Sequence, residues 1–416
     1  MKLSKERIFT PYQVFMIAIL AIIQFTVILD FMVLSPLGAI LMPKLNITTA
    51  QFGFVVSAYA FSAGGTGLLA AGFADRYDRK KFLLFFYVGF LIGTICCAMA
   101  NTYEFLLAAR IVTGIFGGVI GSVGFAIITD LFKFEVRGRV MGFVQMAFAS
   151  SQILGLPIGL YLANQFDWHA PFWLIAIFGI IVGIIIAWKM KPVNEHIKSD
   201  FDHNAFKHLW ENISKPLHLR AFLGTALLAT GGFMLMPFGS AFSINNLGIT
   251  MAQLPTIYFV SGLFSILTGP ILGKFADSIG HFKLFFIGTI VTGILVYIYC
   301  NLGITPLWLV IAVNVVMFAG IMARMVSSGA LISAIPAPKD RGAFMSINSS
   351  IQQISGGVAS FVAGLIVHQN STGFLENYPA LGWTVIGSMI VALGLIYWLS
   401  RHITKLKTAM NVVSPA

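Results

Sequence analysis

The sequence predicts an all-α membrane protein with twelve transmembrane helices in two six-helix repeats. Apolar residues make up 58% of the 416 residues and charged residues only 10%, whereas soluble domains carry about 25% charged residues. Apolar runs repeatedly reach the roughly 20 residues that an α-helix needs to cross a bilayer. A soluble chain of this length has no core large enough to bury so much apolar surface. We therefore expect a multi-pass protein of the cell membrane, in a bacterium the inner membrane.

The twelve predicted helices are apolar runs separated by charged residues, glycine or proline. They are expected at residues 12–41, 50–72, 81–100, 104–132, 139–163, 169–190, 220–245, 251–273, 282–300, 306–334, 342–368 and 379–400. Each is long enough to span the hydrocarbon core of a bilayer.

The net charge of +11 does not indicate a nucleic-acid partner. The basic residues are sorted by loop and do not form a patch with interleaved aromatic residues. With the N-terminus on the cytoplasmic side, all Lys and Arg residues fall on that side except Lys44, which lies outside, and Arg110 and Arg324, which lie within spans. This is the positive-inside bias, and it predicts that both termini are cytoplasmic.

Short matching motifs divide the chain into two halves. Ala74-Asp75-Arg76 follows the second predicted helix and is matched by Ala276-Asp277-Ser278 after the eighth. Arg137-Gly138 is matched by Arg341-Gly342 at nearly the same offset. The predicted units are a six-helix bundle (1–190), a polar cytoplasmic linker (191–219) and a second six-helix bundle (220–416).

Within the linker, Phe206, Leu209, Trp210 and Ile213 recur at helical spacing. This spacing predicts a short amphipathic helix on the inner membrane surface. The linker histidines lack a metal-ligand spacing, and no nucleophile-and-base pattern occurs elsewhere. We therefore expect no enzyme activity, no cofactor and no metal site.

Asp30 is the one carboxylate well inside a predicted span. A charged side chain at a helix centre costs about 2.5 to 3.5 kcal/mol on insertion scales, so a membrane carboxylate is a functional-site candidate. Arg110, in the fourth predicted helix, is expected at a similar depth near the outer side. Its approach or withdrawal would switch Asp30 between holding and releasing a proton. The alternative is a permanent structural ion pair between the two helices.

Arg324, in the tenth predicted helix, has no acid within the spans left to pair with. Alignment of the repeats places it about 15 Å nearer the cytoplasm than Arg110. Two interpretations stay open. Arg324 either binds an anionic group of a substrate, or caps backbone carbonyls and extends toward the membrane surface.

Polar residues within the predicted spans are candidates for substrate binding, and each could equally join helices by hydrogen bonds. The candidates are Gln24, Tyr59, Gln145, Gln152, Tyr258, Asn314, Asn348, Gln352 and Gln353. Gly231-Gly232 and Pro237 are expected to interrupt the seventh helix. Interrupted helices near a repeat interface favour a substrate site.

The loop after the second predicted helix, Ala71-Gly72-Phe73-Ala74-Asp75-Arg76-Tyr77-Asp78-Arg79-Lys80, resembles the signature loop of the major facilitator superfamily, Gly-x-Leu-Ala-Asp-Arg-x-Gly-Arg-Lys. Ala71 and Asp78 stand at the two glycine positions, and aspartate tolerates a left-handed turn better than most residues do. The second-half copy, Gly273 to His281, keeps both glycines but loses the basic pair. The resemblance implies the major facilitator fold over the whole chain.

Two further stretches resemble motifs of this superfamily. Arg110-Ile111-Val112-Thr113-Gly114 is similar to the Arg-x-x-x-Gly motif of proton-linked members, and Gly155-Leu156-Pro157-Ile158-Gly159 to the Gly-Pro-x-x-Gly element of antiporters, with Leu156 inserted. Asp30 falls where the drug/proton antiporter branch often keeps an aspartate. The resemblance therefore implies a monomeric secondary transporter closest to that branch.

The signature loop is expected to act as a conformational latch on the cytoplasmic side. Asp75 can face a helix N-terminus, and Arg79 can reach Asp130 at the inner end of the fourth helix. Arg76 belongs to the same latch, and Asp277 is expected to act more weakly in the second half.

The leading hypothesis for function is proton-coupled efflux of small organic, amphipathic compounds by alternating access. A rival is import or uniport of an anionic metabolite anchored by Arg324. A third is a non-transporting receptor on the same scaffold, but a sensor needs no buried Asp30 or Arg110. The expected partners are a small-molecule substrate, protons and the lipid bilayer.

Overall fold

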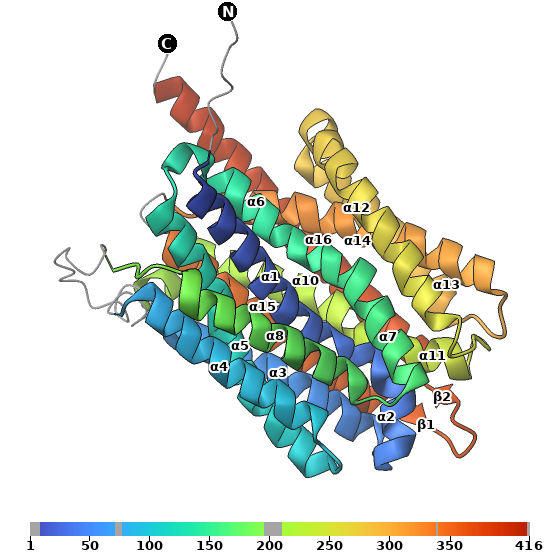
Figure 1. Ribbon diagram of the computed structural model, residues 1–416. Coiled ribbons are helices and arrows are strands. Elements are labelled where there is room, and N and C mark those ends of the chain that lie inside the picture. The colour runs from blue at the N-terminus through green and yellow to red at the C-terminus, as the bar shows by residue number, and fades with distance from the viewer. Residues whose placement is uncertain (1–8, 71–76, 195–209, 338–339, 414–416) are drawn as a thin grey trace, which may run out of the picture.

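A computed structural model describes residues 9–70, 77–194, 210–337 and 340–413. Long helices run side by side, and the start of the first helix lies at the same end as the end of the last one (Figure 1). We call this the terminal end. The opposite end carries a short antiparallel hairpin of strands β1 (His368–Gln369) and β2 (Leu375–Glu376), and we call it the hairpin end.

The first half of the chain forms six helical units, two of which are interrupted. In chain order the elements are α1 (Pro11–Val33), the 3-10 helix η1 (Ser35–Leu37), α2 (Gly38–Leu45), α3 (Thr49–Ala70), α4 (Arg79–Ala98), α5 (Tyr103–Leu131), α6 (Phe134–Ser150), the π-helix η3 (Ser151–Gly155), α7 (Leu156–Gln165) and α8 (Ala170–Lys189).

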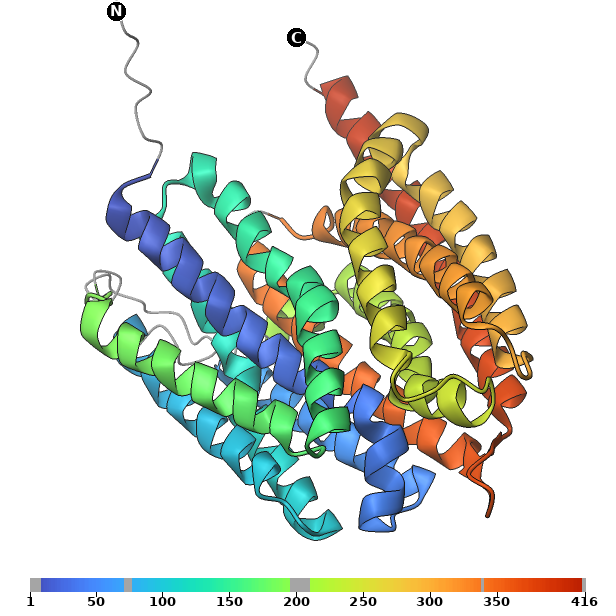
Figure 2. The same cartoon turned by 45° about the vertical axis from the view of Figure 1, so that its right-hand side comes forward.

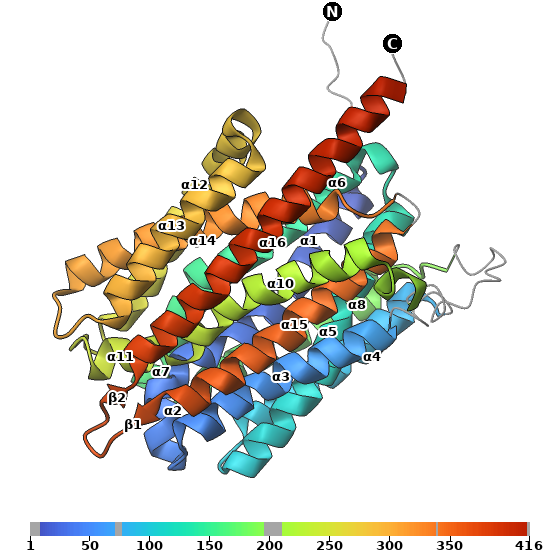
Figure 3. The same cartoon turned by 180° about the vertical axis from the view of Figure 1, so that it is seen from behind.

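The second half repeats this order. Its elements are α10 (Pro216–Leu235), the 3-10 helix η5 (Met236–Phe238), α11 (Gly239–Asn245), α12 (Leu254–Ile279), α13 (His281–Cys300), α14 (Leu307–Ser333), α15 (Arg341–Ile366) and α16 (Tyr378–Val413). Seen from behind, α16 runs across the whole molecule toward the terminal end (Figure 3).

Eleven helical stretches in the described residues are long and apolar enough to cross a membrane. Each coincides with one of the predicted spans. The long helix α15 is not among these eleven. It is long enough to cross a membrane but not apolar enough, because Ser, Asn and Gln residues occupy much of its first half. The prediction of an all-helical membrane protein is thus confirmed, and the count of twelve spans and the cytoplasmic termini stay predictions.

Local capping residues explain where several helices begin. Thr10 and Gln13 form a capping box at the start of α1, and Thr102 accepts a hydrogen bond from the Phe105 N–H at the start of α5. Asp78 accepts from the Lys81 N–H at the start of α4. Its φ is −55°, so the expectation of a left-handed turn at Asp78 is wrong. As an N-cap, Asp78 satisfies a free helix N–H with its side chain and needs no positive φ.

Proline marks each helix interruption. Pro36 and Pro237 lie in η1 and η5, and Pro157 is the second residue after the π-helix η3. Proline cannot donate a backbone hydrogen bond, so the ladder adjusts next to it. The predicted interruption at Gly231-Gly232 is wrong, because both residues lie within continuous α10. Glycine lowers helix propensity but, unlike proline, keeps its N–H.

The buried core is shared by both halves at the hairpin end and divided at the terminal end. One cluster includes Leu37 and Phe52 of the first half together with Phe238 and Ala363 of the second. Toward the terminal end, separate clusters fill the two halves. The ribbons of α7 and α12 likewise lie close together at the hairpin end, whereas α6 and the last part of α12 diverge toward the terminal end (Figure 2).

Hydrogen bonds between the halves also lie near the hairpin end. Thr49 Oγ1 donates to the Val367 carbonyl at 2.6 Å. Asn164 Nδ2 donates to the Met251 carbonyl at 2.9 Å. Both bonds end on backbone carbonyls, so they hold the backbones of the two halves close together at this end. The structure is therefore closed at the hairpin end.

Parts of the predicted linker fall outside the described residues, including Phe206 and Leu209 of the proposed amphipathic helix. Trp210 is helical and exposed, and Ile213 packs against the second-half core near the terminal end. The unit boundaries predicted at residues 190 and 220 remain predictions.

We predict that Gly53→Ala lowers thermal stability. A Cβ at Gly53 would lie 2.8 Å from the Ser360 carbonyl oxygen and 3.1 Å from Gly364 Cα, so α3 and α15 must separate. Overpacking of this kind typically costs about 1 to 3 kcal/mol. The measurement is the unfolding midpoint of purified protein in one detergent. Gly65→Ala on the same helix is the matched control, because no atom lies within 4 Å of that Cβ. Equal midpoints for both variants would contradict tight packing at Gly53.

Candidate functional site

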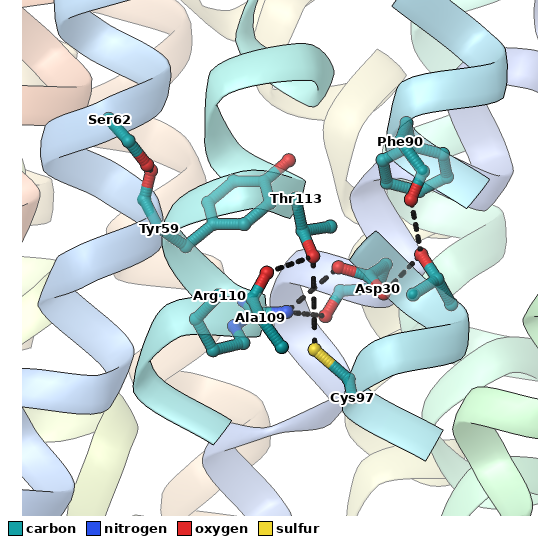
Figure 4. Close-up of polar contacts among 9 residues, drawn as sticks. Asp30, Tyr59, Ser62, Phe90, Cys97, Ala109, Arg110 and Thr113 are labelled. Carbon is teal, nitrogen blue, oxygen red and sulfur yellow. Dashed lines mark hydrogen bonds and ion pairs between the residues drawn. The ribbon is translucent and has the colours of Figure 1, made fainter. Parts of the chain in front are cut away.

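Asp30 and Arg110 form an ion pair inside the first half of the chain. Arg110 Nη1 lies 2.8 Å from Asp30 Oδ2 and also donates to the Asp30 backbone carbonyl at 3.2 Å. Both side chains are fully buried. The pair connects α1 with α5 (Figure 4). The two residues predicted from sequence to share a depth are therefore in direct contact.

Neighbouring side chains hold both members of the pair. Thr94 Oγ1 on α4 lies 3.0 Å from Asp30 Oδ1 and 3.1 Å from the Phe90 carbonyl. The Tyr59 ring on α3 lies against the guanidinium, with Arg110 Cζ 4.6 Å from the ring centroid. Such cation–π contacts gain strength when the cation is removed from water. Four helices thus contribute to one charged cluster.

Small residues let these helices approach closely. A Cβ at Gly114 would lie 2.5 Å from the Tyr59 carbonyl oxygen, so α3 and α5 pack with their backbones nearly in contact. At Gly93, a Cβ would lie 2.8 Å from Thr113 Cα, which brings α4 equally close to α5. Gly114 is the glycine of the Arg-x-x-x-Gly motif, and its position explains why that residue is small.

The charged pair is incompletely hydrogen-bonded. Arg110 Nε and Nη2 have no partner among the described residues. Burial of two charges is stabilising only when attraction and hydrogen bonds together offset the loss of hydration, and removal of one partner leaves an uncompensated charge. The cluster must therefore respond to any change of charge at Asp30, including protonation.

The π-helix η3 packs on α1 beside Asp30. A Cβ at Gly155 would overlap the Leu29 side chain, and Ser151 Oγ lies 3.2 Å from the Phe25 carbonyl. On its other side, Ile153 contacts Gly262 of α12 in the second half. This segment, which includes the start of the predicted antiporter element, connects the charged cluster to the interface between the halves.

Of the predicted latch residues, Arg79 and Asp130 are in contact. Arg79 Nε lies 2.9 Å from Asp130 Oδ2, which joins the start of α4 to the end of α5 at the terminal end. Asp75 and Arg76 lie outside the described residues. Asp277 is exposed near the end of α12 and forms no ion pair with a described residue.

The predicted substrate-binding residues are dispersed. No hydrogen bond joins two of them within the described part of the chain. Gln24 lines a small pocket with Leu20, Gly121 and Val144. Asn348 accepts a 2.5 Å hydrogen bond from Thr225, and Asn314 donates to the Val310 carbonyl of its own helix. The Asn348 contact joins α10 to α15 and fits the alternative of helix joining, whereas the Asn314 contact stays within α14.

The other candidates differ mainly in exposure. Gln145 and Gln352 are exposed, and Gln152, Tyr258 and Gln353 are half-buried. Tyr59 is buried beneath Arg110 and belongs to the charged cluster. Arg324 is buried in the second half, and its Nε and Nη2 have no hydrogen-bond partner among the described residues.

Thr94 was not among the predicted site residues. Threonine in a helix usually donates to a carbonyl of the preceding turn, and Thr94 does so as well as bonding Asp30. Its sequence context therefore gives no signal that distinguishes it from the other threonines in the spans. Only the packing of α4 against α1 brings it to the carboxylate.

An exposed ion pair at the hairpin end contrasts with the buried one. Lys44 Nζ lies 2.7 Å from Asp167 Oδ1, and His169 Nδ1 lies 3.2 Å from Asp167 Oδ2. Partial burial alone would raise the pKa of Asp167, but hydrogen bonds from Lys44, the Trp168 N–H and His169 together lower the pKa below its ordinary value. The side chains are 50% and 39% exposed, so solvent screens this pair.

Comparisons with known proteins agree with the sequence motifs. The family model described as Major Facilitator Superfamily matches residues 20–220 and again 221–411. The uncharacterized MFS-type transporter YceJ of Bacillus subtilis (strain 168) is 27% identical over 87% of this chain and 93% of its own length. Multidrug resistance protein 1 of the same organism is 22% identical over 88% of this chain and 92% of its own.

A similar solved structure is that of a bacterial homologue of the human lysosomal transporter Spinster, in an inward-facing and unoccupied conformation. Its TM-score is 0.73 at 17% identity, and the match covers 95% of this chain and 98% of that one. At this identity the likeness establishes the fold.

We predict that Arg110→Met lowers the unfolding midpoint strongly, because it leaves the Asp30 carboxylate buried without a counter-charge. Breaking a buried pair typically costs about 3 to 5 kcal/mol. The double variant Asp30→Asn/Arg110→Met should recover part of the loss. Lys44→Met, which breaks the exposed pair, should cost at most about 1 kcal/mol. Thermal unfolding of the four proteins in one detergent gives the comparison, and a double variant less stable than Arg110→Met would contradict the proposed pairing.

Proposed function

We propose that this chain, which belongs to the Major Facilitator Superfamily, is a secondary transporter that couples proton movement to the efflux of small organic compounds. Membership of the family is carried by two matches of its model that together extend over residues 20–411. The proton coupling and the direction are our proposal. The observation that carries it is the fully buried ion pair of Asp30 and Arg110.

Protonation of Asp30 would change the balance of charge in the cluster. Neutral Asp30 no longer attracts Arg110 as a carboxylate does, so the guanidinium becomes a buried charge without a counter-ion. Arginine does not release its own proton under these conditions. The cluster can relieve the imbalance by moving α1 relative to α5. A proton at one residue would thereby favour one conformation over another.

The position of the cluster fits a role in alternating access. Asp30 lies shortly before η1, where the two halves contact each other through Ser240 Oγ and the Ser35 carbonyl at 3.4 Å. Leu29 packs against η3, which itself contacts α12. A shift of α1 would therefore act on the closed hairpin end through two routes. Such small shifts at a packed interface are typically amplified into a switch between discrete states.

We propose further that the terminal end faces the cytoplasm. The sorting of Lys and Arg supports this orientation, since Lys44 is the one Lys or Arg at the hairpin end of the described chain. The structure, closed at the hairpin end, would then represent an inward-facing state. The Spinster homologue with a similar fold was likewise captured in an inward-facing conformation.

Efflux is favoured over import by two observations. Multidrug resistance protein 1, similar to this chain over most of its length, is named for drug resistance. The resemblance of Gly155 to Gly159 to an antiporter element points the same way, and η3 lies at the start of that stretch. We propose further that the Arg79–Asp130 pair helps to hold the inward-facing state.

We predict that Asp30→Asn abolishes uphill transport driven by a pH gradient while substrate exchange between equal pools persists, because exchange requires no net protonation. The measurement is uptake into proteoliposomes with and without a pH gradient. Asp167→Asn, which removes an exposed acid, is the matched control and should retain coupling. Full pH-driven uptake by the Asp30→Asn protein would exclude Asp30 as the proton carrier.

We predict that Asp130→Asn lowers turnover with little change in substrate affinity. Loss of its contact with Arg79 alters the balance between conformations and leaves the cavity unchanged. Initial transport rates and equilibrium binding on the same preparation separate the two effects. The comparison variant is Asp277→Asn, for which we expect a smaller effect because Asp277 forms no ion pair with a described residue. A large loss of affinity at normal turnover would place Asp130 in the binding site.

A further inference from the structure

Arg324 is a buried arginine to which the described chain offers no acidic partner. Its side chain is 5% exposed. Nε and Nη2 are without hydrogen-bond acceptors among the described residues, which leaves the N–H groups of one edge of the guanidinium free. The Phe285 ring centroid lies 5.7 Å from Arg324 Cζ. A cation–π contact at that distance is weak and does not replace a counter-charge.

In the first half of the chain, the buried arginine Arg110 is neutralised by a carboxylate of the chain itself, Asp30. Pro36 and Pro237 occupy the 3-10 segments η1 and η5, which interrupt the first helix of each half. When these prolines are aligned, Asp30 falls at the position of Gly231. Arg110 therefore has Asp30 as its partner, whereas the corresponding position of the second half has no side chain.

Arg324 reaches this very position. A Cβ at Gly231 would lie 3.8 Å from Arg324 Nη1 and 3.9 Å from Ser388 Oγ. The adjacent Gly232 is exposed, and no atom lies within 4 Å of its ideal Cβ. One turn further along α14, Ser327 Oγ is also buried without a hydrogen-bond partner in the described chain. Arg324 and the Ser388 hydroxyl thus border a position at which the described chain provides no negative charge.

We propose that the transported compound carries an anionic group, a carboxylate or a sulfonate, that binds Arg324 beside Gly231. The inference rests on the proposed transport function and narrows its substrate class to organic anions. The ligand supplies to Arg324 the counter-charge that Asp30 supplies to Arg110. Nη1, which faces Gly231, and the neighbouring Nη2, which has no partner in the described chain, can donate to two oxygens of such a group and form paired charge-assisted hydrogen bonds. Arg324 in this account binds substrate, and Asp30 carries the proton.

Binding of matched probes tests the charge requirement. The probes are 1-naphthoate and 1-naphthalenesulfonate, each compared with its neutral amide, on purified full-length protein in detergent. We expect the anions to bind roughly thirtyfold tighter than the amides, and Arg324→Gln to remove that preference, because truncating a desolvated charge pair has effects of this size. Arg401→Gln, at an exposed arginine near the terminal end, should keep it. Equal affinity for anions and amides, or an unchanged preference in Arg324→Gln, would overturn the proposal.

A second variant replaces the ligand with a side chain. Gly231→Asp introduces a carboxylate next to Arg324 at a position whose Cβ contacts are all 3.7 Å or longer. We expect it to raise the unfolding midpoint above that of Gly231→Asn and to abolish binding of the anionic probes. Gly231→Asn provides the same volume without the charge. A midpoint no higher for Asp than for Asn would show that Arg324 does not face this position.

Two further outcomes are informative. If sodium chloride alone protects the protein from unfolding as well as the naphthalene anions do, Arg324 holds an inorganic ion and the substrate assignment fails.

Failure of the inference is distinguishable from failure of the proposed function. Arg324→Gln with unchanged anion preference and Asp30→Asn with lost pH-driven uptake would reject the organic anion and keep proton coupling. The converse result would keep the anion site and reject Asp30 as the coupling residue.

Discussion

The structure depends on the burial of one ion pair in a medium that solvates charge poorly. Asp30 and Arg110 are 2.8 Å apart and fully enclosed, and removal of either charge leaves the other uncompensated. The close approach of α3, α4 and α5 at Gly93 and Gly114 follows from the need to deliver Thr94 and Tyr59 to this pair. Protonation of Asp30 would therefore change the energy of this cluster. Under the proposed proton coupling, the same constraint that positions the helices would also make the site responsive to protons.

Most of the fold could be predicted from apolar run length, because each helix must satisfy its own backbone hydrogen bonds in lipid. The interruptions η1, η3 and η5 were harder to predict. Proline at 36, 157 and 237 gives a signal, but whether the chain responds with a 3-10 turn or a π-helix depends on the neighbouring packing. The glycines at 231 and 232 gave a misleading signal, because α10 is continuous through both. Glycine lowers helix propensity but keeps the backbone N–H that the helix needs.

The charged residues of the site could be predicted, and their partners could not. Asp30 and Arg110 are conspicuous because ionised side chains are rare in membrane spans. Thr94, Tyr59 and Ser151 are common residue types in helices. Only the packing of α4 and η3 on α1, and of α3 on α5, gives them their contacts. The amide-bearing candidates show the reverse. Asn314 stood out in the sequence, yet it bonds its own helix backbone, as a polar side chain in lipid commonly does.

The two halves share a helix order but differ in how they neutralise a buried arginine. In the first half the counter-charge is part of the chain. The Asp30–Arg110 pair therefore persists in the absence of substrate, and Asp30 is available to bind a proton. In the second half the aligned position is Gly231, and Arg324 stays without an acidic partner in the described residues. A buried charge of this kind favours any conformation that supplies an anion or admits water to it. A substrate anion would thus stabilise the conformation in which it is enclosed, whereas protonation of Asp30 would act on the opposite half. If the proton binds in the first half and the substrate in the second, each ligand acts on the same interface between the halves. A shared conformational equilibrium of this kind is the thermodynamic requirement for coupling proton movement to substrate movement.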